Sequence, residues 1–100
     1  MTHILALNGS PRRNGNTETV LNAFLRGAEE AGATCETIRL SSLTFKNCLG
    51  CNACHKKGVC VITDALTEVF EKVMACDILV LASPIYSMTV TAEMKGFIDR

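Results

Sequence analysis

The most constraining feature of the sequence is a polar turn that joins an apolar run to an amphipathic helical pattern. The turn, residues 8–17, reads Asn-Gly-Ser-Pro-Arg-Arg-Asn-Gly-Asn-Thr and follows the apolar run 4–7. Gly9 and Gly15 allow the backbone to reverse tightly after a buried strand. Hydroxyl, amide and backbone N–H groups at the positive end of the following helix can then surround an anion. The turn therefore predicts an anion site suited to phosphate.

Two better-known glycine loops do not match this turn. A nucleoside-triphosphatase loop requires a lysine after its second glycine, whereas Asn16 follows Gly15. A dinucleotide fingerprint requires glycine where Pro11 stands. The pattern that is left suits one terminal monophosphate, with Arg12 and Arg13 as charge-assisted donors. The alternative is an Asn/Gly-rich turn that only caps a helix.

The composition indicates one ordinary globular domain over residues 1–100, with 48% apolar and 20% charged residues. A net charge of zero argues against nucleic acid or an anionic membrane as a partner. No basic start precedes a long apolar stretch, and no apolar run approaches the roughly 20 residues of a membrane span. We therefore expect a cytoplasmic protein. In that compartment six cysteines indicate metal or redox chemistry rather than a disulfide framework.

Strand and helix signals alternate along the chain. Apolar runs at 3–7 and 78–82 predict buried strands, and mixed polarity at 34–40 predicts an edge strand. Helical spacing predicts helices that begin near residues 17, 64 and 92, with 41–63 as a long loop. The second helix carries one apolar stripe: Leu66, Val69, Phe70, Val73 and Met74. This order predicts an α/β fold with a parallel sheet.

The predicted topology brings two loops to one ligand. In the flavodoxin-like strand order, the chain leaves strands 1 and 3 in opposite directions and opens a crevice at their carboxyl ends. The first strand ends at the polar turn. The third ends at residues 83–87, where a proline stiffens the turn and Tyr86 offers an aromatic face. A ligand that spans both loops carries a phosphate and a flat ring, and flavin mononucleotide (FMN) fits that description.

Three motifs in this order make the chain resemble the NAD(P)H-dependent FMN reductase and iron–sulfur flavoprotein group of the flavodoxin-like superfamily. The motifs are the turn 8–17, the cysteine segment 48–60, and Ala82-Ser-Pro-Ile-Tyr86 followed by Lys95-Gly-Phe-Ile-Asp-Arg100. The resemblance implies a doubly wound parallel sheet that binds FMN. It assigns the FMN phosphate to Ser10, Arg12, Asn16 and Thr17. It assigns the isoalloxazine edge to Pro84, Ile85, Tyr86 and Ser87.

The resemblance also implies more sheet than this sequence contains. Members of the group are nearly twice as long, with two further strands after the third helix. We therefore expect the N-terminal part of such a domain, with three strands and three helices, truncated after the third helix. The third strand is then an exposed apolar edge, which invites pairing with another chain. A fragment of a longer gene product and a chain completed by association, as in a homo-oligomer, both fit this expectation.

Four cysteines lie within thirteen residues at C-x2-C-x2-C-x5-C spacing: Cys48, Cys51, Cys54 and Cys60. Thiolates at such spacing can hold an iron–sulfur cluster, and the motif resembles the compact one of the iron–sulfur flavoproteins. Three alternatives stay open: a four-iron cluster, reduced thiols or a loop disulfide without metal, and zinc, which usually takes two separated pairs of ligands. Cys35 and Cys76 are predicted to pack as small buried hydrophobes.

These features together predict an FMN-dependent oxidoreductase. Its flavin takes a hydride from NAD(P)H, or electrons from a protein donor, and passes them to a small acceptor such as a quinone. Because the flavin supplies this chemistry, we assign no catalytic side chain. With a four-iron cluster, the protein would be an iron–sulfur flavoprotein electron carrier with a ferredoxin-like donor. The alternative from another class is a non-enzymatic module that senses redox state or metal.

Overall fold

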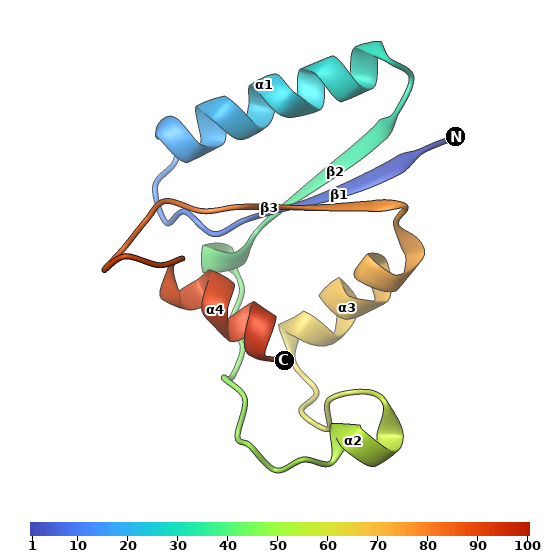
Figure 1. Cartoon of the computed structure of the whole chain (residues 1–100), viewed down its shortest axis with the longest axis vertical. Coiled ribbons are helices and arrows are strands. Elements are labelled where there is room, and N and C mark those ends of the chain that lie inside the picture. The colour runs from blue at the N-terminus through green and yellow to red at the C-terminus, as the bar shows by residue number, and fades with distance from the viewer.

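The alternating strands and helices assemble into a three-stranded parallel sheet that has helices on both faces (Figure 1). The computed structural model describes residues 1–100. The strands are β1 (His3–Asn8), β2 (Thr34–Arg39) and β3 (Ile78–Ala82). The helices are α1 (Asn16–Glu30), α2 (Cys54–Lys57), α3 (Ala65–Ala75) and α4 (Ala92–Asp99), with a short 3-10 helix η1 (Leu40–Ser42). None of the helices combines the length and apolar character that crossing a membrane requires.

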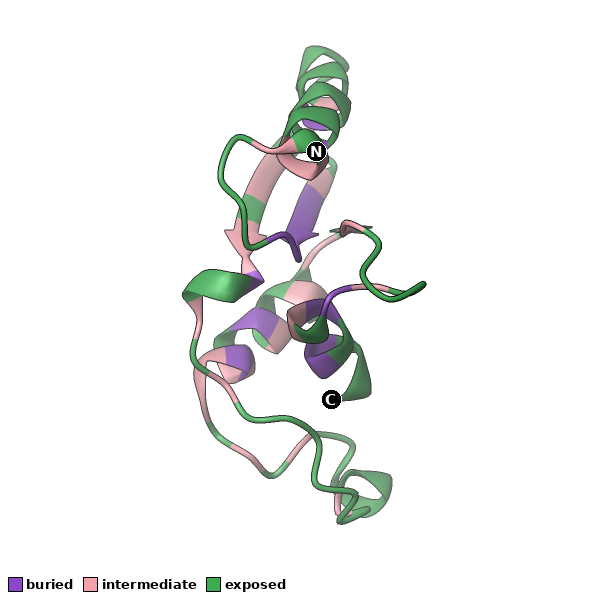
Figure 2. Cartoon of the chain, turned by 90° about the vertical axis from the view of Figure 1, so that its left-hand side faces the viewer, coloured by how far each residue is buried: buried purple, intermediate pink, exposed green.

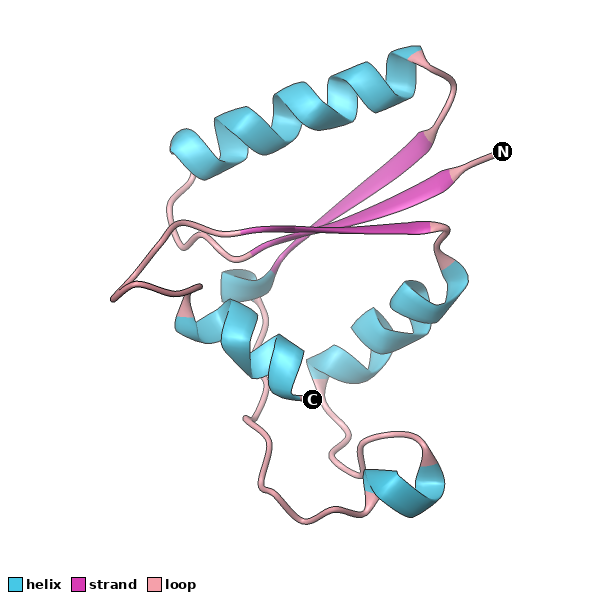
Figure 3. Cartoon of the chain, in the orientation of Figure 1, coloured by secondary structure: helices cyan, strands magenta, loops and turns pink.

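The strand order is β2-β1-β3, and β1 pairs in parallel with both neighbours. In the register, Leu5 lies opposite Glu36 on one side and Leu79 on the other. Helix α1 covers one face of this sheet, and α3 and α4 cover the other (Figure 3). The α/β fold, the parallel sheet and the switch in direction after β1 are as predicted from the sequence.

The unbroken apolar character of β1 follows from its central place. Successive side chains of a strand point to opposite faces, so each face needs its own apolar set. The face toward α1 buries Ile4, Ala6, Leu21 and Leu25. The face toward α3 and α4 buries Leu5, Leu7, Leu40, Leu66, Val69, Met94 and Phe97. The rings of Phe70 and Phe97 stack with centroids 5.3 Å apart, which joins α3 to α4.

Strand β3 is less buried than its apolar sequence predicted. Ile78 is 45% exposed and Leu81 is 44% exposed, because β3 is an edge strand with no neighbour on one side. Beside it, Val20 and Phe24 of α1 are 70% and 53% exposed. The expectation of an apolar edge on the third strand is met, whereas the expectation of a fully buried strand was wrong.

Two further expectations need correction. The segment 41–63, predicted as a loop, includes the end of η1 and the single turn of α2, so the chain has four α-helices where three were predicted. On α3, Met74 lies outside the apolar stripe and is 86% exposed. At about 100° per residue, Met74 is displaced by roughly 80° from Leu66 around the helix, which places it at the margin of the buried face.

The two ends of the predicted stripe should therefore respond differently to truncation. Leu66→Ala removes a fully buried side chain and should lower the free energy of unfolding by about 2–5 kcal/mol. Met74→Ala removes an exposed side chain and should change it by about 0.5 kcal/mol or less. Urea unfolding followed by circular dichroism measures both values. Equal losses for the two variants would contradict this placement of α3.

Candidate functional site

The polar turn begins where β1 ends, in a closely packed junction. The N–H of Gly9 donates to the carbonyl of Ala82 at the end of β3, at 2.8 Å. A Cβ atom on Gly9 would lie 2.9 Å from Thr91 Oγ1 and 3.0 Å from Met94 Cβ, so no larger residue fits. Thr91 Oγ1 donates to the Gly9 carbonyl at 2.7 Å and caps α4 by accepting from the N–H of Met94. This junction fixes the start of the turn against β3 and α4.

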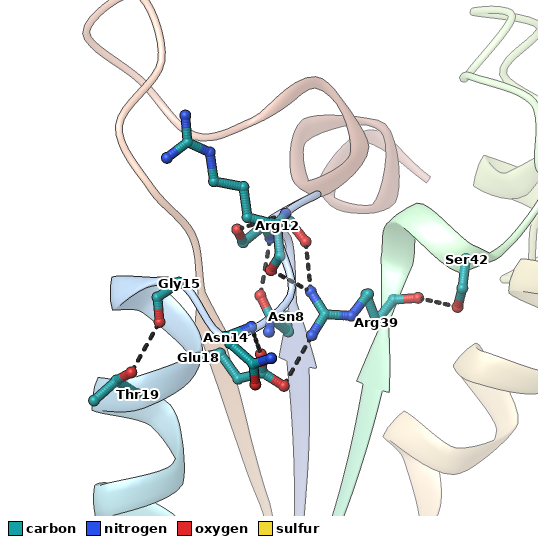
Figure 4. Close-up of polar contacts among 9 residues, drawn as sticks. Asn8, Arg12, Asn14, Gly15, Glu18, Thr19, Arg39 and Ser42 are labelled. Carbon is teal, nitrogen blue, oxygen red and sulfur yellow. Dashed lines mark hydrogen bonds and ion pairs between the residues drawn. The ribbon is translucent and has the colours of Figure 1, made fainter.

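The turn then folds on its own side chains. Asn8 Oδ1 accepts from the N–H of Ser10 at 2.9 Å, and Ser10 Oγ accepts from the N–H of Arg12 at 3.2 Å (Figure 4). Asn8 and Ser10 are both buried, whereas Arg12 is exposed. Asn and Ser side chains commonly form such local bonds in turns. The sequence predicted Ser10 as a phosphate donor, and here its oxygen also serves the turn as an acceptor.

The first turn of α1 has no side-chain cap. Gly15 is the N-cap residue, and no side chain accepts from the backbone N–H groups that follow it. Such N–H groups carry the positive end of the helix dipole and are suited to an anion. Of the predicted donors here, Asn16 is exposed and Thr17 is half-buried. The donor chemistry of this turn therefore fits a phosphate.

Sequence reasoning missed two residues that contact the turn, Arg39 at the end of β2 and Glu18 in the first turn of α1. They form an ion pair at 2.9 Å. Arg39 also donates to the turn, and Glu18 accepts from the N–H of Asn14 (Figure 4). That N–H, together with the Arg39 guanidinium, lowers the pKa of Glu18 although partial burial opposes the shift. The available signal was the position of Arg39 at the carboxyl end of a strand beside β1.

The second predicted loop follows β3 and forms a tight hairpin. Tyr86 and Thr89 exchange two backbone hydrogen bonds of 2.8 and 3.1 Å. Between them, Ser87 and Met88 have φ angles of 49° and 68°. Positive φ at both central residues suits this hairpin turn but is unusual without glycine or asparagine. Non-glycine residues in such positions are concentrated at functional sites, where the surrounding structure holds them.

The predicted ring contacts in this loop differ in exposure. Pro84 is half-buried and Ser87 is exposed, while Ile85 is 81% and Tyr86 44% exposed. The Tyr86 ring is therefore not a core side chain. Ser83 closes the base of the loop, because its Oγ accepts from the N–H of Thr91 at 3.0 Å and donates to the Pro84 carbonyl at 2.8 Å. Both loops leave the same carboxyl edge of the sheet (Figure 1).

The four closely spaced cysteines lie on a long segment that projects away from the sheet (Figure 2). Cys48, Cys51 and Cys54 are exposed, Cys60 is half-buried, and all the cysteines of the chain are free thiols. No three His, Cys, Asp or Glu side chains gather into a metal-binding group. The donor chemistry fits a soft metal or a cluster, and holding one requires the segment to close around it.

The other two cysteines are less buried than predicted. Cys35 and Cys76 are both half-buried and pack at the margins of the two core clusters. Cys76, which directly follows α3, donates from Sγ to the Val73 carbonyl of that helix at 3.1 Å. Its thiol therefore has a hydrogen-bond partner. Neither side chain joins the thiols of the 48–60 segment in a metal-binding group.

Arg100 joins both ends of the cysteine segment. Its fully buried side chain donates from Nη1 to the Lys46 carbonyl at 2.9 Å and from Nη2 to the Ile62 carbonyl at 3.0 Å. Nη1 also pairs with Asp64 Oδ2 at 2.7 Å. The N–H of Ile62 and the Arg100 guanidinium lower the pKa of Cys60. We call the residues that Arg100 joins, Lys46, Ile62 and Asp64, the base of the cysteine segment. Cys60 lies beside this base, unlike the three exposed thiols.

Asp64 holds this base to α3. It accepts from the N–H groups of Lys46 and Leu66 at 2.9 and 3.0 Å and forms a capping box with Thr67. Burial raises the pKa of Asp64, but the bonds from Arg100, Lys46 and Leu66 outweigh burial, so the pKa lies below its usual value. A helix start near residue 64 was predicted from the sequence, whereas the buried ion pair was not, because Arg100 is 36 residues away.

Comparisons with known proteins find relatives over nearly the whole chain. A model of the family described as NADPH-dependent FMN reductase matches residues 2–100. An iron–sulfur flavoprotein of Archaeoglobus fulgidus is 44% identical over 92 residues, which cover 92% of this chain and 42% of that protein. An iron–sulfur flavoprotein of Methanosarcina thermophila is 35% identical over 97 residues, 97% of this chain and 51% of that protein.

A solved structure extends the agreement to three dimensions. The NAD(P)H:quinone oxidoreductase from Methanothermobacter marburgensis superposes with a TM-score of 0.81 at 26% identity, over 99% of this chain and 52% of that one. The fold is therefore flavodoxin-like, as the sequence predicted. The chain belongs to the NADPH-dependent FMN reductase family. It spans about half the length of the curated relatives it matches.

The base of the cysteine segment should show a defined pH dependence. The lowered pKa of Asp64 means that its carboxylate stabilises the fold above its unfolded pKa of about 3.9, and that this stability is lost as pH falls through the lower folded pKa. Asp64→Asn should remove that part of the acid dependence, measured as unfolding free energy between pH 7 and pH 2. Asp99→Asn, at an exposed pair with Lys95, is the control and should retain it. An unaltered profile in Asp64→Asn would contradict the assignment.

Proposed function

We propose that this chain forms the FMN-binding part of an oxidoreductase. The observation that carries the proposal is the uncapped N-terminus of α1, which lies at the same sheet edge as the hairpin after β3. One loop offers donors for a phosphate, and the other offers an exposed aromatic side chain beside a proline. FMN carries the matching pair of groups. Membership in a family described as NADPH-dependent FMN reductase supports the same ligand.

In this proposal the side chains bind and orient the cofactor. Ser10, Arg12, Asn16 and Thr17 hold the phosphate, and Pro84, Ile85, Tyr86 and Ser87 contact the ring. When bound, the flavin supplies hydride and electron transfer, so the chain needs no acid–base pair. The hydrogen-bonded hairpin of Tyr86 and Thr89 keeps the ring-contacting loop in one conformation. The similar Methanothermobacter protein is named an NAD(P)H:quinone oxidoreductase, which supports NAD(P)H as the donor and a quinone as the acceptor.

A second proposal concerns the cysteine segment. We propose that Cys48, Cys51, Cys54 and Cys60 hold a four-iron cluster, with a ferredoxin-like protein as the electron donor. Both relatives cited above are named iron–sulfur flavoproteins, and all four thiols are free here. Cys60 is fixed near Arg100, so closure would bring the exposed cysteines toward an ordered ligand. The cluster adds one-electron transfer when present.

The free edge of β3 supports a proposal about assembly. Ile78, Leu79 and Leu81 of that strand are partly exposed. The exposed Val20 and Phe24 of α1 line a groove together with residues 80–82 of β3. An exposed apolar edge strand is a template for pairing. We propose that further strands, from a longer polypeptide or from a second copy in a homo-oligomer, cover this edge.

The FMN proposal predicts a loss that depends on the phosphate. The combined Ser10→Ala and Asn16→Ala variant removes two donors, and each hydrogen bond to a charged group contributes about 1.5–3 kcal/mol. FMN affinity should fall at least roughly tenfold in calorimetric titration, with riboflavin affinity little changed. The matched control combines Ser41→Ala with Asn22→Ala, which lie at exposed positions outside the turn. Equal losses for FMN and riboflavin would show that the turn does not hold the phosphate.

The cluster proposal predicts a defined metal content. Anaerobic reconstitution with iron and sulfide should give about four of each per chain in chemical analysis. Cys51→Ser should abolish this content, because a hydroxyl is a poor replacement for a thiolate on iron. Cys76→Ser is the control, since that thiol bonds within its own helix region, and it should leave the stoichiometry unchanged. A wild-type chain that retains no iron, with all thiols titratable, would leave FMN as its redox cofactor without a cluster.

A further inference from the structure

The guanidinium of Arg39, at the end of β2, lies against the polar turn 8–17. Its Nη1 donates to the carbonyls of Ser10 and Arg12, both at 2.9 Å. Its Nη2 pairs with Glu18 Oε1 at 2.9 Å. The Arg39 and Glu18 side chains are only 16% and 25% exposed, so this is a partly buried ion pair. Figure 4 shows the guanidinium on the β2 side of the turn, where the Glu18 side chain reaches it from α1.

These contacts constrain the peptide planes of the turn. All peptide bonds of the chain are trans, so the C=O and N–H of one peptide unit point in opposite directions. Arg39 draws the Arg12 carbonyl toward β2, and the N–H of Arg13 therefore points away from Arg39. The Ser10 carbonyl belongs to the peptide unit of Pro11, which has no N–H. Of the two peptide units that Arg39 fixes, only the second presents a donor, at Arg13.

Glu18, which belongs to α1, holds the turn at a further point. One oxygen pairs with Arg39, and the other accepts from the N–H of Asn14. The carbonyls of residues 10 and 12 and the N–H of residue 14 are thus all held by one ion pair. This arrangement leaves the N–H of Arg13 and the uncapped start of α1 free for an anion.

Arg39 itself is not placed to bind the phosphate. Its guanidinium contacts two carbonyls and a carboxylate, all of which belong to the protein. A guanidinium holds such a set in a fixed planar fork, which the single ammonium of a lysine does not reproduce. The effect of Arg39 on an anion therefore passes through the shape of the turn.

We propose that Arg39, held by Glu18, is a positioning residue that keeps the turn 8–17 in its phosphate-binding conformation. The inference rests on the proposed function, since it assigns that turn to the phosphate of FMN. It adds a residue from β2 to a site that the sequence placed on β1, β3 and the start of α1. Arg39 contributes by fixing the shape of the turn, and its positive charge alone does not account for its role.

The first arm of the test uses the protein without any ligand. Amide hydrogen exchange followed by NMR should show faster exchange at Asn14 in Arg39→Gln, by roughly tenfold, because Glu18 loses the partner that holds it. Arg26→Gln changes an exposed arginine of α1 that does not contact the turn, so it is the matched control and should leave this exchange unchanged. Unchanged exchange at Asn14 in Arg39→Gln would overturn the inference whether or not FMN binds.

The second arm compares FMN with riboflavin by calorimetric titration. Arg39→Gln should lower the ratio of FMN affinity to riboflavin affinity roughly tenfold, and Arg39→Lys should restore little of it. Full recovery in Arg39→Lys would assign the effect to charge and overturn the positioning role. An equal fall for both ligands would assign it to general stability and also overturn it. A wild-type protein without preference for FMN would contradict the proposed function itself, while the exchange arm would still report on the turn.

Discussion

The structure depends on the central strand β1, which pairs on both edges and packs on both faces. Residues 4–7 are buried on both faces of the sheet, so they are apolar without alternation. The first polar side chains, Asn8 and Ser10, come where the strand leaves the sheet, and both are buried. Buried polar groups need partners, and these two find them within the turn itself. The burial of β1 therefore leads directly to an ordered polar turn at its end.

That turn is held from three directions. Ala82 and Thr91 bond to the backbone of Gly9, and Arg39 bonds to the carbonyls of the following residues. The result is a turn whose own hydrogen bonds are largely made, next to a helix start whose N–H groups have no side-chain cap. This contrast between a satisfied turn and an unsatisfied helix end is the physical basis for the proposed anion site. The cysteine segment has a similar division, with an ordered base at Arg100 and exposed thiols beyond it.

Much of this arrangement could be predicted from local sequence patterns. The apolar run of β1, the helical spacing after residue 17 and the order of the strands follow from periodicity and turn chemistry. Contacts between distant residues could not be predicted in this way. Arg39 reaches Ser10 across 29 residues and Arg100 reaches Asp64 across 36, and neither pair leaves a local signal. The Ser87-Met88 turn also contradicts its local preference, because positive φ favours other residues.

The central claim is that the turn at the end of β1 binds a terminal phosphate, and a titration of the unmodified protein tests it most directly. FMN and riboflavin share one ring system and differ in the phosphate, so the difference in their calorimetric affinities isolates the contribution of that group. We expect FMN to bind at least roughly tenfold more tightly than riboflavin, because hydrogen bonds to a charged phosphate add affinity. Equal affinities for the two ligands would contradict it.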